Sequence, residues 1–200
     1  MTEQNQTTAR IGPNSITRMA QALRHQHDEQ VTARIFEAAG LTGHLAHPPT
    51  AMVDERDVTA LHRALREELT AEQASAVSLE AGQLTGDYLL ANRIPKPVQS
   101  ILKPLPAGLS SRILLKAIER NAWTFAGSGQ FQVNHQPSLT LTITNSPLCR
   151  EAQSAHPVCD YYAGTFQRLF QVLVHPRTQV TETQCAATGA THCVFEVRWQ

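Results

Sequence analysis

Hydrophobic residues recur every three or four positions through the first 120 residues, a period that predicts amphipathic helices. The segments with this spacing are 16–23, 31–36, 58–69, 76–89, 98–102 and 109–118. Thr70 and Gln73 form a capping-box pair before the fourth of these segments, which ends ahead of Pro95. We therefore expect a long, central helix there, and a loop over the glycine- and proline-containing stretch 41–50.

The period changes after Asn121. Hydrophobic and polar residues alternate from Trp123 to Val133 and again over 139–143, around a turn at 134–137, and this pattern predicts a β-hairpin. Helical spacing returns over 158–173, and two short strands are expected at 178–183 and 194–199. The sequence therefore predicts an α+β fold, in which N-terminal helices cover a small antiparallel sheet and a hairpin, a helix and a second hairpin close the chain.

The predicted organisation is one domain. Residues 1–13 are polar and are expected to form a flexible lead, and residues 14–200 form a single unit that is mainly helical over 14–121 and hairpin–helix–hairpin over 122–200. Seventeen basic residues balance seventeen acidic ones, which argues against a nucleic-acid partner. No stretch is long and apolar enough for a transmembrane segment, and the polar N-terminus lacks a signal-peptide core, so a cytoplasmic location is expected.

The cysteines carry the main chemical signal. Cys185 should end one strand and Cys193 begin the next, so that the intervening loop with Gly189 brings the two thiols together. Cys159 lies near the start of a predicted helix and is well placed as a third ligand, whereas Cys149 lies in a loop beside Pro147 and is expected to lie apart from the set. A thiolate-rich set of four ligands suits a structural, tetrahedral Zn²⁺ ion.

The fourth ligand stays open on spacing alone. Glu182 lies three positions before Cys185 and reaches the same side of a strand only through a bulge or twist, and His192 or Asp160 could take its place. Two other interpretations also remain: the cysteines are buried hydrophobic residues, or they hold an iron–sulfur cluster, although no Cys-x-x-Cys spacing is present.

Motifs for a redox cofactor are absent from the sequence. Gly127-Ser128-Gly129 is followed by Gln132 where a dinucleotide fingerprint requires its third glycine, and we interpret it as a turn. No P-loop or recognisable flavin motif is present. A self-sufficient reductase is therefore difficult to support from the residues.

Several segments together carry a family resemblance: YLLANRIPKPVQ, LLKAIERNAWTFAGSGQF, NSPLCR, VCDYYAGTFQRLF and TETQCAATGATHCVFEV. From about residue 50 onward they resemble the 4-vinyl-reductase-like domain family of small-molecule-binding α+β modules, and within it the bacteriochlorophyll 4-vinyl reductases of photosynthetic bacteria. The resemblance to zinc-binding sensor members implies the metal ligands Cys159, Glu182, Cys185 and Cys193, and so favours Glu182 over His192.

The resemblance also implies a function in bacteriochlorophyll synthesis. We expect a protein that binds a magnesium-tetrapyrrole intermediate of the divinyl (proto)chlorophyllide type and supports its 8-vinyl reduction as a carrier or accessory factor. The alternatives are the reductase itself and a ligand-sensing or assembly module for another enzyme of the pathway. A location peripheral to the photosynthetic membrane fits this role, and the choice between monomer and homodimer stays open.

Candidate ligand contacts are aromatic. Tyr88, Trp123, Phe125 and Phe131 could stack on a macrocycle, although aromatic residues at such periodic positions also serve as core. Basic residues around the proline-rich connection could pair with a propionate or form a solvated rim; they are Arg93, Lys96, Lys103 and Arg112. Loop histidines that could supply an axial nitrogen are His44, His47 and His135.

Overall fold

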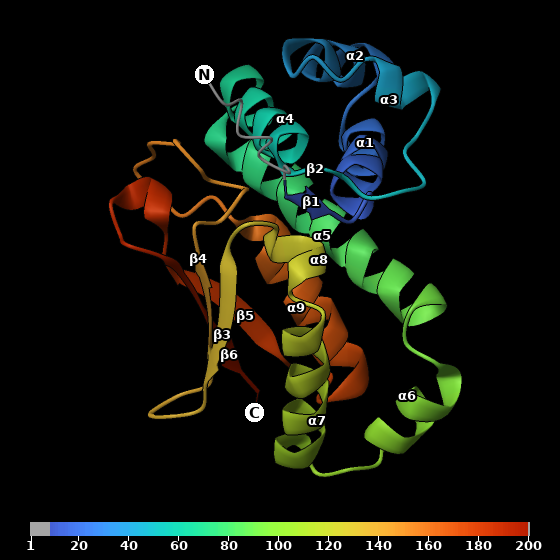
Figure 1. Cartoon of the computed structure of the whole chain (residues 1–200), viewed down its shortest axis with the longest axis vertical. Helices are drawn as coiled ribbons and strands as arrows, with labels where there is room; N and C mark the ends of the chain where they lie inside the picture. Colours follow the sequence, from blue (N-terminus) through green and yellow to red (C-terminus); the bar gives the residue numbers. More distant parts are fainter. Residues whose placement is uncertain (1–8, 200) are drawn as a thin grey trace, which may run out of the picture.

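The computed structural model describes residues 9–199, and Figure 1 shows how their helices and strands are arranged. The helices are α1 (Asn14–Gln26), α2 (Glu29–Ala38), α3 (Gly43–Ala46), α4 (Glu55–Glu68), α5 (Ala71–Asn92), α6 (Lys96–Leu102), α7 (Ala107–Arg120), α8 (Trp123–Ala126) and α9 (Asp160–Leu173). The strands are β1 (Arg10–Ile11), β2 (Val53–Asp54), β3 (Gln130–Asn134), β4 (Thr140–Thr144), β5 (Gln179–Gln184) and β6 (Cys193–Arg198), with a short 3₁₀ turn at Ala186–Thr188. This order confirms the predicted α+β fold class.

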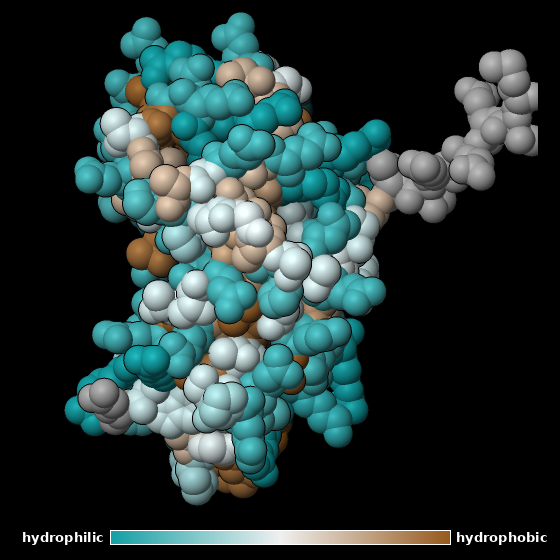
Figure 2. Space-filling model, turned by 90° about the vertical axis from the view of Figure 1, so that its left-hand side faces the viewer, coloured by the Kyte–Doolittle hydropathy of each residue, from teal (hydrophilic) through white to brown (hydrophobic). Residues whose placement is uncertain are grey.

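The main sheet is antiparallel and has the order β3-β4-β6-β5. Its register places Leu141 opposite Val133 and Phe195, and Ile143 opposite Phe131 and Cys193, so these residues share one face. Helices α9 and α7 cover that face, on the right of the sheet in Figure 1. The side of the molecule that lies at the left in Figure 1 is mainly hydrophilic, with only small hydrophobic patches (Figure 2). The side chains of β4 and β6 that face α9 and α7 are the fully buried ones, although Thr142 on the opposite face is also buried.

Helix α5 is the central helix that the capping-box pair predicts. The Thr70 side chain accepts from the Gln73 backbone N–H while the Gln73 side chain accepts from the Thr70 N–H, which satisfies two free donors at the start of the helix. The helix packs against α1 and, most extensively, against α9. A Cβ on Gly82 would lie 2.1 Å from the Tyr161 carbonyl oxygen, and one on Gly164 would lie 2.4 Å from that of Leu79. Glycine at these positions lets α5 and α9 approach backbone to backbone.

Three elements differ from the predicted pattern, and the first is α3 (Gly43–Ala46), one helical turn within the stretch 41–50 where a loop is expected. Trp123–Ala126 is the short helix α8 rather than the start of a strand, because the Phe125 and Ala126 N–H groups donate to the Ala122 carbonyl and close a helical turn. Strand β3 begins only after the turn at residues 127–129. The alternating side chains at 123 and 125 thus belong to a helical turn followed by a strand, a junction that a short periodicity window does not resolve.

The third difference is a two-stranded sheet, which the pattern missed. Strand β1 pairs antiparallel with β2, and the neighbouring Gly12 N–H donates to the Thr124 carbonyl at 2.7 Å. Strand β1 and Gly12 lie within residues 1–13, the segment that is expected to be a flexible lead. Residues 1–8 of that segment fall outside the described residues. Over 9–199, no helix combines the length and apolar character that crossing a membrane requires.

Candidate functional site

Four buried cysteines meet between the sheet and the start of α9. Cys159 is the residue immediately before α9, Cys185 follows β5 and precedes the 3₁₀ turn, and Cys193 is the first residue of β6. Gly189 adopts φ +95° in the loop that returns from Cys185 to Cys193, a conformation that favours glycine. Each of the four side chains is at most 2 % exposed. The hairpin and the helix start therefore bring the three expected thiols to one point.

The sulfur–sulfur distances describe a compact, unbridged cluster. The Cys159 Sγ lies 3.6 Å from that of Cys193 and 4.0 Å from that of Cys185, and the last two are 3.9 Å apart. Cys149 Sγ lies 3.5 Å from Cys193 Sγ. A disulfide requires about 2.05 Å, whereas four sulfurs at about 2.3 Å from one tetrahedral ion are spaced by roughly 3.8 Å. The cluster can hold a metal ion.

Cys149 belongs to this cluster, contrary to the expectation that it lies apart. Its loop is held by α4: the Thr59 hydroxyl donates to the Pro147 carbonyl at 2.7 Å, and Arg66 Nη1 donates to the Leu148 carbonyl at 2.9 Å. These contacts span more than eighty positions, so no local pattern reveals them. The number of cysteines in the sequence could have indicated this role, because a fourth thiol completes the tetrahedral ligand set that three thiols leave open.

Glu182 lies beside the sulfurs. A register shift in β5 between Glu182 and Gln184 supplies the bulge that its carboxylate needs to reach the Cys185 side of the strand. Its Oε2 accepts from the Cys159 backbone N–H at 2.8 Å, and its Oε1 is buried with no hydrogen-bond partner among the described residues. Burial, followed by the charge of Cys185, raises the pKa of Glu182 to about 8. His192 is half-buried, and its ring bonds to the Thr191 hydroxyl instead.

The close approach of the four thiols shifts their pKa values in opposite directions. Sulfur hydrogen bonds from Cys159, Cys185 and Cys193 lower the pKa of Cys149, while the corresponding contacts raise the pKa of Cys159. Four buried thiolates repel one another unless a cation offsets their charge. The half-buried Arg66 supplies one positive charge beside them: burial lowers its pKa, and the thiolates of Cys159 and its neighbours act in the opposite direction.

A large apolar cleft adjoins the cluster. It has a volume of about 880 Å³, within the range of roughly 300–1,000 Å³ found for small-molecule pockets. Its walls come from the start of α1, the C-terminal half of α5, α7, α8 and the length of α9. Leu148 and Tyr161 line it, one residue from Cys149 and two from Cys159 respectively. The cleft and the sulfur cluster are thus adjoining parts of one region.

Three of the four predicted aromatic contacts line the cleft, and the fourth does not. Tyr88, Trp123 and Phe125 line the cleft, and Trp123 is 62 % exposed at its wall. Phe131 is not among the lining residues in the described chain; its ring packs edge-on against Phe125 at 5.4 Å from behind. None of His44, His47 and His135 lines the cleft within residues 9–199, so the structure offers no axial nitrogen from these loops there.

The hydroxyl groups along α9 are already engaged. Tyr162 donates to the Phe125 carbonyl at 2.8 Å, and the Tyr161 hydroxyl bonds to that of Thr85 at 2.8 Å. Burial raises the pKa of both tyrosines. His62 packs edge-on to Tyr161 with its ring completely buried, and neither ring nitrogen has a partner among the described residues. Burial, and then the charge of Arg66, lowers the pKa of His62 to about 3, so its imidazole is neutral at pH 7.

The polar residues of the cleft include two arginines and no acid among the described lining residues. Arg18 projects from α1 and lies over the Tyr88 ring, with Cζ 5.0 Å from the ring centroid. Its Nη1 donates to Gln21 Oε1 at 2.7 Å, and its Nε is buried without a partner in the described structure. Sequence patterns gave no reason to single out Arg18, because one basic residue on an amphipathic helix is ordinary.

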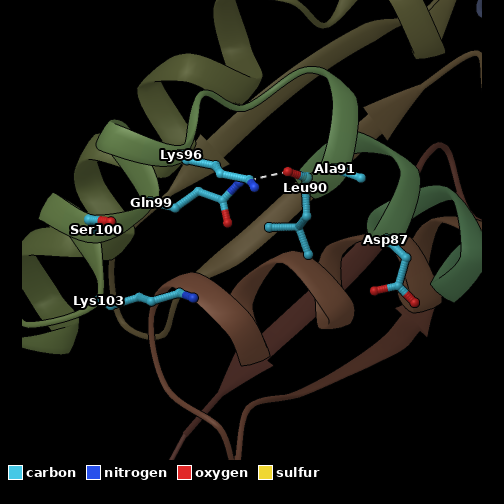
Figure 3. Close-up of a pocket in the computed structure, with 7 residues that line it drawn as sticks. All are labelled: Asp87, Leu90, Ala91, Lys96, Gln99, Ser100 and Lys103. Carbon is cyan, nitrogen blue, oxygen red and sulfur yellow. Dashed lines mark hydrogen bonds between the residues drawn. The ribbon is translucent and has the colours of Figure 1, made fainter.

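A second, open hollow of about 430 Å³ lies between the end of α5 and α6. Figure 3 shows Gln99 pointing at the end of α5, where its Nε2 donates to the Leu90 carbonyl at 2.6 Å. Lys96 and Lys103 line this hollow, and its one acid, Asp87, pairs with Arg168 at 2.6 Å. The hollow has a solvated, basic wall, and Gln99 acts there as a connector between helices.

The Gly127-Ser128-Gly129 segment is a turn, as predicted. Gly127 has φ +59°, and a Cβ there would lie 2.2 Å from the Glu55 carboxylate. The Ser128 N–H and hydroxyl donate to that carboxylate at 2.8 and 2.7 Å, and Arg150 Nη1 donates at 2.8 Å. Burial raises the pKa of Glu55, but these donors lower it by more. The turn binds a buried carboxylate of its own chain rather than a phosphate.

These features define a small α+β module with a buried thiol cluster and an apolar cleft. The model of the V-4-R domain matches residues 139–199, which include all four cysteines. The chain is 41 % identical to the bacteriochlorophyll synthase 23 kDa chain of Cereibacter sphaeroides, over 94 % of this chain and 90 % of that protein. It is 38 % identical to the protein of the same name from Rhodobacter capsulatus, over 93 % and 85 % respectively. The chain therefore belongs to the family of bacteriochlorophyll synthase 23 kDa chains.

The fold of this chain also resembles that of a solved structure. The Fe(II) unliganded H-NOX protein from K. algicida superposes with a TM-score of 0.58, over 94 % of this chain and 96 % of that one. Only 10 % of the residues are identical. The likeness therefore concerns the arrangement of helices and strands alone.

Proposed function

We propose that this protein is an accessory factor of bacteriochlorophyll biosynthesis that binds a divinyl (proto)chlorophyllide-type tetrapyrrole and carries it for 8-vinyl reduction. The observation that carries the proposal is the cleft of about 880 Å³ beside the cysteine cluster in a chain of this family. Its lining is largely apolar, with aromatic rings from Tyr88, Trp123 and Phe125, and a flat apolar ring system gains most from such walls.

The cluster is proposed to hold a structural Zn²⁺ ion. Four of the six sulfur pairs are 3.5 to 4.0 Å apart and all six lie within 4.8 Å, which suits four thiolates around one tetrahedral ion, and zinc has no preference that this geometry violates. An ion there would supply the positive charge that four buried thiolates require, and it would fix the start of α9 against β6. The arrangement leaves no open coordination position, so the ion supplies stability rather than catalysis.

The ligand set can be assigned by substitution. The family resemblance implies Cys159, Glu182, Cys185 and Cys193, whereas the sulfur distances favour Cys149 in the place of Glu182. We propose four thiolates, with Glu182 holding the Cys159 backbone N–H from outside. Elemental analysis of purified protein should find one zinc per chain, and Cys149→Ser should lose it while Glu182→Gln keeps it. Loss of zinc from Glu182→Gln alone would restore the carboxylate as the ligand.

The carrier proposal is tested by binding and turnover together. Titration of the purified protein with divinyl chlorophyllide should give saturable binding, seen as a shift in pigment absorbance. Incubation with the same pigment and NADPH should leave the 8-vinyl group intact, because the sequence carries no recognisable dinucleotide or flavin motif. Turnover without a second protein would make this chain the reductase, and absence of binding would remove the tetrapyrrole from the proposal.

A partner is part of the proposal, since a carrier must hand its pigment to an enzyme. The partners we propose are other enzymes of the bacteriochlorophyll pathway, at a site peripheral to the photosynthetic membrane, with residues 14–200 acting as one domain. A pull-down should recover more of a pathway enzyme when the pigment is present. Pigment-dependent recovery with no delivery of pigment would favour the sensing or assembly role instead.

A further inference from the structure

We infer that Arg18 anchors a carboxylate of the cleft's ligand, so that the cleft selects the free acid of its pigment over an ester. This inference rests on the proposed function, because it assigns the chemical form of the same tetrapyrrole. Arg18 lines the cleft from α1, where residues 14–18 form one of its walls.

The first argument is an unfilled donor. Arg18 Nε is buried and has no partner among the described residues, although Nη1 of the same guanidinium bonds to Gln21 Oε1. A buried donor without a partner destabilises the empty cleft, because it has lost its hydrogen bonds to water and gained none from the protein. A ligand that supplies an acceptor at this point recovers that cost, and a carboxylate recovers most because its hydrogen bond is charge-assisted.

The second argument is the balance of charge. Within the described part of the chain the cleft is lined by Arg18 and Arg93, and no Asp or Glu lines it. Two acids of α5 that could offset the charge of these arginines pair with other residues: Asp87 pairs with Arg168, and Glu80 pairs with His25. An apolar pocket with uncompensated cations favours an apolar ligand that carries a negative charge.

The third argument is geometry. The Tyr88 ring lies under the Arg18 guanidinium at 5.0 Å, which restricts the side chain before any ligand arrives. A guanidinium held in one plane presents a fixed fork that matches the two oxygens of a carboxylate. An ester keeps the ring system and its apolar contacts but loses the charge and one acceptor oxygen, so it tests the anchor without disturbing the rest.

Arg93 has a lesser role. It is the residue that follows α5, and it is exposed, so solvent screens its interaction with any ligand. We assign the selectivity to Arg18 and place Arg93 at the rim.

The experiment compares chlorophyllide with the methyl ester of its propionate, titrated into the full chain at fixed ionic strength. Wild-type protein should bind the acid roughly tenfold to a hundredfold more tightly. Arg18→Gln should remove the preference, so that acid and ester bind with the same affinity, and saturable binding of the ester reports an intact cleft. Arg24→Gln on the same helix, where Arg24 pairs with Glu29 outside the cleft, should keep the full preference.

The outcomes separate the two proposals. Equal binding of acid and ester by the wild-type protein overturns the anchor and leaves the carrier function standing. Binding of neither pigment removes the carrier function and the anchor with it. A preference that survives Arg18→Gln, or that Arg93→Gln abolishes instead, overturns the assignment to Arg18.

Discussion

The cysteine cluster and the apolar cleft share helix α9 but differ in what fills the space beside it. At the N-terminus of the helix, four side chains are buried to 2 % exposure or less and lie within 4.8 Å of one another. Along its length, Tyr161, Phe166 and Leu169 are also at most 5 % exposed, but they line a cleft of about 880 Å³ that the side chains do not fill. The cysteine cluster is filled by its own side chains, whereas the cleft leaves an open volume and the buried Nε of Arg18 without a partner among the described residues.

The contrast teaches how one helix can serve stability and recognition together. A ligand-binding cleft leaves a volume that the chain's own side chains do not fill, which weakens folding, because the residues that line it lose packing contacts. Neighbouring structure must offset that loss. The glycine contacts between α5 and α9 and the sulfur cluster hold the wall in place from behind and from its end.

The largest effect should come from breaking the cysteine cluster. Cys193→Ser removes the sulfur that lies near all the others, and it should lower the free energy of unfolding by about 5 kcal/mol or more, because structural metal binding contributes on the order of 10 kcal/mol. Urea unfolding followed by circular dichroism, together with zinc content, measures this. Ser100→Ala, at an exposed position in α6, is the control. Unchanged stability and metal content would show that the cluster has no structural role.

A second substitution tests the support between the regions. Gly82→Ala places a methyl group 2.1 Å from the Tyr161 carbonyl and should destabilise the protein by about 3 kcal/mol, since α5 and α9 must move apart. Gly108→Ala in α7 meets nothing within 4 Å and should be neutral or stabilising by up to about 1 kcal/mol. Equal thermal midpoints for the two variants would contradict the close helix approach.

His62 between the two regions predicts a loss of stability in acid. Its folded pKa of about 3 lies below its ordinary value of 6.5, so between these values the unfolded chain binds more protons and stability falls as the pH falls. Above pH 6.5 His62 is mainly neutral in both the folded and the unfolded chain, so the stability lost on its protonation is fully present there. From pH 7 to pH 5 it should lose roughly 2 kcal/mol, at 1.36 kcal/mol per unit.

His62→Leu should remove this part of the pH dependence. The measurement is urea unfolding of both proteins at pH 7 and pH 5, and the relevant quantity is the difference between their pH responses, because protonation of the thiolates is common to both. Parallel loss of stability in the two proteins would mean that His62 gains a proton without cost.

The smallest effect concerns the cleft. Trp123→Ala should weaken pigment binding about tenfold, because an aromatic wall of the cleft is lost, while the free energy of unfolding changes little at a side chain that is 62 % exposed. Ile101→Ala is a matched control, since Ile101 is also 62 % exposed and does not line the cleft. Equal pigment affinity in the two variants would remove Trp123 from the binding wall.

Local sequence predicted the elements well where one period ran over many residues. The apolar stripe over 76–89 with its Thr70 cap became α5, and the alternation around Leu141 became β4. Prediction failed at the short segments, where Trp123–Ala126 closes a helical turn and Arg10–Ile11 gains strand structure only by pairing with β2. Two-residue strands carry no period of their own, and their hydrogen bonds come from a distant partner.

The sequence by itself determined the hairpin pair Cys185 and Cys193 and the nearby Cys159, because chain connectivity and Gly189 limit how these segments fold. Only the tertiary structure decided that Cys149 joins them, since contacts from α4 hold its loop there, and that Arg18 lies over Tyr88 inside an apolar cleft. Periodicity encodes which face of an element is apolar. It does not encode which distant elements pack on that face, and a site built from several elements depends on that packing.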